Sequence, residues 1–168
     1  MTRKPYEIDG LSLVVRDRDG GADAIGFLTL GEAYLVAAEK LVSDERSFIP
    51  TVGSPESLLT GHALELLLKS FLLACGVPVD DLKQKVGHKL RKCLKKAEDK
   101  GISKIAPVSP YLREAVNILS DEYSEKHFEY FLGTGRAVRT DLRQLLLEIR
   151  KVYEALESVY LGALKRHR

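Results

Sequence analysis

The stretch that decides the fold is residues 54–101, which read SPESLLTGHALELLLKSFLLACGVPVDDLKQKVGHKLRKCLKKAEDKG. It opens with a serine and a proline, a capping residue followed by the one that fits the first helical position. Apolar residues then cover most of the helix circumference as far as Cys75, which predicts a helix buried on most sides. Gly76 and Pro78 end this helix, because glycine suits the position after a helix and proline cannot continue one.

Two charged residues interrupt this apolar helix near its middle. Glu65 and Lys69 are four residues apart, the spacing at which opposite charges meet on a helix surface. The helix is about long enough to cross a membrane, but both charges would be costly in lipid. The sequence therefore predicts the central helix of a water-soluble protein, with an ion pair inside the protein or at its edge.

A second helix is predicted over residues 88–100, with a start as early as Asp81. One of its faces is apolar and the other is basic. Between residues 83 and 96 the chain carries seven cations and no acid: Lys83, Lys85, Lys89, Arg91, Lys92, Lys95 and Lys96. Such a face suits a phosphate backbone, with Lys85, Lys89, Lys92 and Lys96 as the expected contacts. The alternative is an ordinary solvated helix face.

The rest of the chain also predicts helices. Residues 1–25 form a short irregular arm with an apolar segment at residues 11–15, and a helix follows over residues 26–42. The face of this helix expected to meet the core consists of Phe27, Leu30, Tyr34, Ala37, Ala38 and Leu41. A serine and a proline open another helix at residues 109–110, which ends near residue 124.

The last helix is predicted from a cap at Thr140 or Asp141 to about residue 165. Its core-facing residues recur every seven positions: Leu142, Ile149, Leu156 and Ala163. Five helical segments without a strand pattern after residue 25 predict an all-α fold, a four- to five-helix up-and-down bundle. We expect a single domain over residues 26–168.

Composition narrows the function classes. The 168 residues carry a net charge of +2, so the chain as a whole gives no reason to expect nucleic acid binding. We find no signal peptide and no uninterrupted apolar segment of membrane-spanning length, and both cysteines fall in predicted helices, which favours a cytoplasmic protein. The four histidines are dispersed and no phosphate-loop glycine pattern occurs, so neither a metal nor a cofactor is expected.

Several residues are candidates for chemistry. His88 lies at a predicted helix start, where it could act as a base or hold the apolar helix by a hydrogen bond. Arg136 and Arg139 follow a Gly-Thr-Gly turn and could bind an anion. The catalytic candidates are His88, His127, Arg136 and Arg139, and the candidate pocket is Glu65, Lys69, His88, Tyr130 and Arg136.

One combination of these residues resembles a known family. The segment from Glu65 to Lys69, Gly76, and then Gly87-His88-Lys89-Leu90 and Gly101 resembles the HEPN superfamily of bacterial and archaeal helical domains. The resemblance extends over residues 26–165 and includes the aromatic and glycine-rich segment 128–135. It implies a bundle of four or five helices, usually a homodimer, often involved in RNA cleavage, toxin-antitoxin or phage-defence systems, or nucleotide-linked partnerships.

The chain departs from the nuclease members of that superfamily at one motif. Those members carry an arginine four to six residues ahead of a histidine, and no arginine here has that position. The resemblance therefore implies a binding module, a partner of RNA, a nucleotide or another protein, without an evident catalytic centre. The alternatives are a divergent metal-independent ribonuclease and a purely structural interaction subunit.

Overall fold

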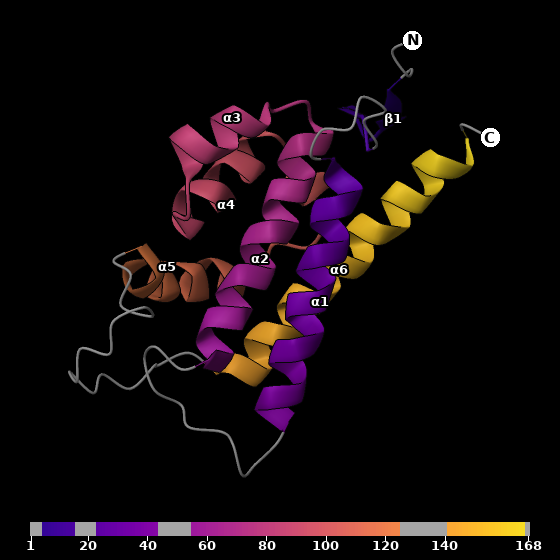
Figure 1. Ribbon diagram of the computed structural model, residues 1–168. Coiled ribbons are helices and arrows are strands. Elements are labelled where there is room, and N and C mark those ends of the chain that lie inside the picture. Colours follow the sequence, from indigo (N-terminus) through magenta and orange to yellow (C-terminus); the bar gives the residue numbers. More distant parts are fainter. Residues whose placement is uncertain (1–4, 16–22, 44–54, 125–140, 167–168) are drawn as a thin grey trace.

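The computed structural model describes residues 5–15, 23–43, 55–124 and 141–166, and these are mostly helical (Figure 1). The elements are β1 (Tyr6–Ile8), β2 (Leu11–Leu13), α1 (Ala24–Ser43), α2 (Pro55–Ala74), α3 (Val79–Asp81), the π-helical η1 (Leu82–Val86), α4 (Leu90–Asp99), the 3₁₀-helical η2 (Ile102–Lys104), α5 (Pro110–Ser124) and α6 (Leu142–Lys165). The predicted all-α class is confirmed, with a two-stranded hairpin added at the N-terminal side.

Helix α2 is the centre of the arrangement. It contacts α1 and α6 on one side and α4 and α5 on the other (Figure 1). Helix α1 runs antiparallel to α2, as an up-and-down order requires, whereas α5 runs across α2 instead of alongside it. The up-and-down description therefore fits the α1–α2 pair but not the whole set of helices.

The burial of α2 follows from its composition. By length and composition alone α2 could cross a membrane, but 78% of its most apolar window is buried inside the protein. Leu64, Leu67, Phe71 and Leu72 are fully buried. These side chains meet helices on several sides, which is the environment that a nearly uniform apolar circumference requires.

Local signals fixed the helix ends as the sequence predicted. After α2, Gly76 has φ +77°, and the N–H groups of Gly76 and Val77 donate to the carbonyls of Leu73 and Leu72, which is a Schellman motif. The Asp141 carboxylate caps α6 by accepting from the N–H groups of Arg143 and Gln144 at 2.9 and 3.2 Å. The predicted heptad residues of α6 are all buried: Leu142, Ile149, Leu156 and Ala163.

The face of α1 that enters the core differs from the prediction. The residues buried in α1 are Ala24, Leu28, Gly31, Leu35, Ala38 and Val42, whereas Leu30 is 49% exposed. The reason is close packing: a Cβ on Gly31 would lie 2.9 Å from Leu67 Cδ2, so the glycine lets α1 approach α2 more closely than a larger residue would. The small residues therefore select the buried face, and most of the predicted face is only half-buried.

The N-terminal hairpin closes one end of the helices. In the hairpin Tyr6 is paired with Leu13 and Ile8 with Leu11, and the turn between the strands has positive φ at Asp9 and Gly10. Leu13 is 1% exposed, and the N–H of Val14 donates to the carbonyl of Ala74 at 2.8 Å. The apolar segment of the arm thus belongs to the core.

The segment between α2 and α4 forms short helical turns where the sequence predicted a helix from residue 88, or from as early as Asp81. The chain forms α3 and η1, then breaks at Gly87, where φ is +58° and ψ −136°. That conformation is open to glycine and closed to residues with a Cβ. As a result α4 begins at Leu90, two residues later than predicted, and His88 lies outside it, facing α2.

Candidate functional site

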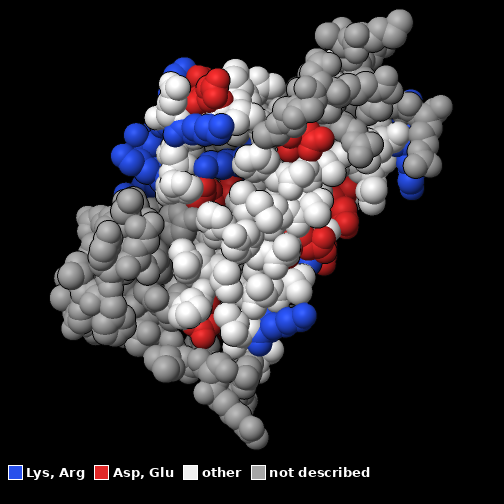
Figure 2. All heavy atoms as spheres, in the orientation of Figure 1, with Lys and Arg blue, Asp and Glu red and all other residues white. Residues whose placement is uncertain are grey.

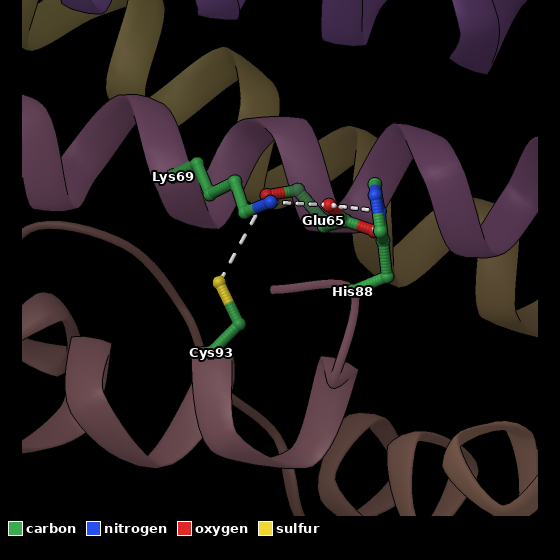
Figure 3. Close-up of polar contacts among 4 residues, drawn as sticks. All are labelled: Glu65, Lys69, His88 and Cys93. Atoms are coloured by element: carbon green, nitrogen blue, oxygen red, sulfur yellow. Dashed lines mark hydrogen bonds and ion pairs between the residues drawn. The ribbon is translucent and has the colours of Figure 1, made fainter. Parts of the chain in front are cut away.

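The candidate site is built around a buried ion pair on α2. Glu65 Oε1 lies 2.5 Å from Lys69 Nζ, and the two side chains are 2% and 10% exposed (Figure 3). The pairing predicted from the four-residue spacing is therefore confirmed. Both charges are withdrawn from water, so each requires the other for its stability.

His88 completes this pair from the segment before α4. Its Nδ1 lies 3.1 Å from Glu65 Oε1 and 3.3 Å from Oε2 (Figure 3). When Nδ1 donates to the carboxylate, Nε2 is left as an acceptor. The side chain is 74% exposed, so a buried carboxylate orients an imidazole that solvent can reach. The predicted hydrogen bond from His88 to the apolar helix is confirmed.

A second histidine lies beside the first. His62, one turn before Glu65 on α2, has its ring nearly parallel to that of His88, with centroids 6.5 Å apart. The Tyr34 ring of α1 meets His62 edge-on at 4.6 Å. Burial lowers the pKa of His62 below its ordinary value of 6.5, and the opposing effect of Glu65 is smaller. His62 is therefore biased towards its neutral form.

The basic residues of η1, of α4 and of the link between them form an exposed face. We call Lys85, Lys89 and Lys92 the basic face; all three are exposed, and Lys96 at its edge is half-buried. Figure 2 shows basic atoms gathered over α3 and α4. Lys85 pairs with Asp81 at 2.8 Å and lowers the pKa of that carboxyl, so Lys89 and Lys92 are the cleaner positions for testing an anion.

Contacts between α4 and α5 hold α4 in place and so set the orientation of the basic face. The N–H of Arg91 donates to Ser120 Oγ at 2.9 Å, which satisfies one N-terminal donor of α4. The Arg91 guanidinium donates to the side chain and the carbonyl of Asn117 at 3.0 and 2.9 Å. Arg91, one of the predicted cations, thus serves to hold α4 against α5.

The structure brings together part of the candidate pocket. Glu65, Lys69 and His88 lie in direct contact, whereas Tyr130, Arg136, His127 and Arg139 fall outside the described residues. Sequence reasoning missed that His62 lies beside His88 and that Tyr34 contacts His62, because a contact between two elements has no signal within either one. It also did not predict that Ser120 of α5 accepts the N–H of Arg91 at the start of α4.

The cysteines carry no sign of reactivity. Burial raises the pKa of Cys75 to about 11 and that of Cys93 to about 12, so both are thiols at neutral pH. Cys93 lies against α2, with Sγ 4.0 Å from the carbonyl of Glu65 (Figure 3).

Within the described ranges, no group of three metal-ligating side chains is placed to hold an ion. No protein-family model, curated protein or solved structure matches the chain.

Proposed function

We propose that this protein is a helical module that binds RNA through the basic face of η1 and α4. The observation that carries the proposal is the exposure of Lys85, Lys89 and Lys92 on a segment without acidic residues from 82 to 97. Phosphate groups are attracted to such a surface with little dependence on base sequence.

The rigid support of this face favours binding by a preformed surface. Arg91 ties α4 to α5, and Cys93, Leu90 and Ala97 anchor its other side in the core. The lysines thus extend from a helix whose backbone is already fixed, which limits the entropy cost when an anion binds. A pattern of phosphates can then be matched by a fixed pattern of cations.

The test is fluorescence anisotropy with a labelled single-stranded RNA oligonucleotide at several salt concentrations. Replacing Lys89 and Lys92 by alanine should weaken binding and flatten the salt dependence by about 0.7 for each phosphate that is no longer neutralised. The matched control is Lys40→Ala with Lys165→Ala, which removes the same charge from exposed sites on α1 and α6. An equal loss of affinity in both double variants, or a wild-type protein that does not bind at low salt, would refute the proposal.

A second candidate function is metal-independent RNA cleavage, which the Glu65–His88 contact favours. His88 Nε2 would take the proton of a ribose 2′-hydroxyl while that oxygen attacks the adjacent phosphorus, and the 5′-oxygen would leave with a proton from water. The products would be a cyclic phosphate and a 5′-hydroxyl. Cleavage of labelled RNA in the presence of a chelator, abolished by His88→Ala, would support it; cleavage undiminished in that variant would exclude His88.

The HEPN relationship is part of the same proposal. It is supported by a buried α2 with its Glu65–Lys69 pair, a glycine stop and a histidine placed before a basic helix. A role in a bacterial defence, stress or toxin-antitoxin system is the corresponding biological setting. Solving the structure of a complex with RNA or with a genomic neighbour would test that setting.

A further inference from the structure

A cavity of about 190 Å³ lies between α1 and α6, neither of which carries the basic face. Apolar side chains from both helices form most of its wall, and two carboxylates and a phenol lie among them. Leu161 lines the cavity and is 49% exposed, so it lies at the mouth, where solvent can enter. The lining includes Ile25, Leu28 and Glu32 of α1, and Tyr153, Glu157 and Leu161 of α6.

The two carboxylates of the cavity share one hydroxyl group. Tyr153 is 5% exposed, and its hydroxyl donates to Glu157 Oε1 at 2.6 Å. The Glu32 carboxylate, from the other helix, lies beside the same hydroxyl. Burial, Glu157 and Glu32 together raise the pKa of Tyr153, so the phenol keeps its proton at neutral pH. Because a hydroxyl has one proton to donate, it can satisfy only one of the two carboxylates.

The neighbouring cation is engaged elsewhere. The Arg150 guanidinium lies 5.4 Å from the centroid of the Tyr153 ring, but it donates to both carboxylate oxygens of Glu39. Over the ranges that the structure describes, no salt bridge joins Glu32 or Glu157 to a cation. Figure 2 shows acidic atoms where α1 meets α6. Two such carboxylates in the wall of a partly enclosed cavity favour a positively charged ligand.

These features identify the chemical class of the ligand. We propose that the cavity between α1 and α6 binds a small organic cation, a guanidinium group on a short alkyl stem. A guanidinium presents five N–H donors in a planar fork, so one group can reach both Glu32 and Glu157. The stem would lie against the apolar wall. Pockets for drug-sized ligands hold about 300–1,000 Å³, so a cavity of 190 Å³ suits a ligand about the size of one long side chain.

The surroundings of the mouth favour a free molecule over the side chain of a partner protein. Next to Leu161 on the same helix, Ser158 and Glu154 are exposed and polar. A polypeptide that inserted an arginine would find little apolar surface to cover beside the cavity, and such surface supplies much of the affinity of protein partners. A small cation needs only the cavity itself.

The first test is an NMR titration of the ¹⁵N-labelled protein with n-butylguanidinium. Saturable shifts should come from amides of residues 25–32 and 153–164, with a dissociation constant of about 1 mM. N-butylurea has nearly the same shape without the charge, and it should bind about tenfold or more weakly, because charge-assisted hydrogen bonds are lost. Equal binding of the two compounds, or no saturable shift in these two segments, would overturn the proposal.

The second test separates charge from shape by matched variants. Glu157→Gln keeps an acceptor for Tyr153 and should weaken n-butylguanidinium binding by about tenfold or more, whereas Glu154→Gln removes the same charge outside the cavity and should not. Leu161→Ser should also weaken binding, unlike Leu147→Ser, which changes a 58% exposed leucine elsewhere on α6.

Circular dichroism checks that each variant is folded. Equal losses in Glu157→Gln and Glu154→Gln would reduce the effect to general attraction by an acidic surface and would refute the site. A blocked Ala-Arg-Ala tripeptide that binds more than about tenfold tighter than n-butylguanidinium would overturn the assignment to a free molecule. Because α1 and α6 carry no part of the basic face, these outcomes do not depend on whether the protein binds RNA.

Discussion

Lysines occur in two contrasting settings on neighbouring elements, the interior of α2 and the basic face. Lys69 is buried and held by Glu65, whereas Lys89, just before α4, and Lys92, on α4, are exposed to solvent. A buried charge depends on its partner for stability, whereas an exposed one contributes little to folding and remains available to a ligand. The comparison shows that burial, and not residue type, decides whether a lysine stabilises the fold or is available to bind an anion.

The largest expected effect is the loss of one partner of the buried pair. Glu65→Ala should lower the free energy of unfolding by about 3–5 kcal/mol, because Lys69 would be left buried without its counter-ion. Urea unfolding measures this change. Lys85→Ala, which breaks a solvent-facing pair with Asp81 at the same four-residue spacing, should cost less than about 1 kcal/mol. Similar losses in both variants would remove the distinction between buried and exposed pairs.

The next largest effect concerns Gly87, which lies in the segment between α2 and α4. Gly87→Ala should destabilise the protein by about 1–3 kcal/mol, because φ +58° with ψ −136° is strained for any residue with a Cβ. A Cβ there meets nothing closer than 3.8 Å, so the loss would be conformational and not a clash. Gly26→Ala, at a position inside α1, should change stability by no more than about 1 kcal/mol. An unaffected Gly87→Ala protein would contradict the assigned backbone conformation.

A smaller effect should depend on pH through His62. Its pKa is lowered in the folded protein by burial, so the unfolded chain binds more protons once the pH falls below about 6.5. Stability should therefore decrease as the pH drops through that value. His62→Gln should show a shallower decrease than wild type when unfolding is followed from pH 7.5 to 5.5. Identical slopes would mean that His62 titrates alike in both states.

The smallest effect is expected on the basic face. Lys89→Ala with Lys92→Ala should change the free energy of unfolding by no more than about 0.5 kcal/mol, because exposed side chains without packing contribute little. Thermal or urea unfolding checks this directly. A large decrease would show that these lysines hold the fold, and the weaker RNA binding expected of this variant could then no longer be assigned to the missing lysine charges.

The parts of the fold that could be predicted are those with a local cause. The Asp141 cap and the Gly76 stop each arise within a few residues, and the seven-residue repeat of α6 needs no knowledge of its neighbours. The Glu65–Lys69 pair was likewise predicted from spacing alone. Each of these signals is contained in a single element.

The parts that could not be predicted depend on competition between elements. Helix α1 has two apolar faces of similar quality, and the choice depended on how closely Gly31 lets it approach Leu67. The helix start was predicted at residue 88 or as early as Asp81, and the sequence did not show that short helical turns end at Gly87 before α4 begins at Leu90. In the site, His88 was singled out by its position, but its neighbours Tyr34 and His62 come together only through packing.

Ser70 carries a consequence for the order in which the chain assembles. Its Oγ lies 2.6 Å from the carbonyl oxygen of Ala24 and 3.1 Å from the hydroxyl of Tyr160, residues 46 and 90 positions away. During synthesis α1 and α2 can pair early, but the Tyr160 side of this contact waits until α6 has been made. Until then the flank of α2 that α6 covers stays exposed, and the nascent protein is most prone to aggregation before α6 leaves the ribosome.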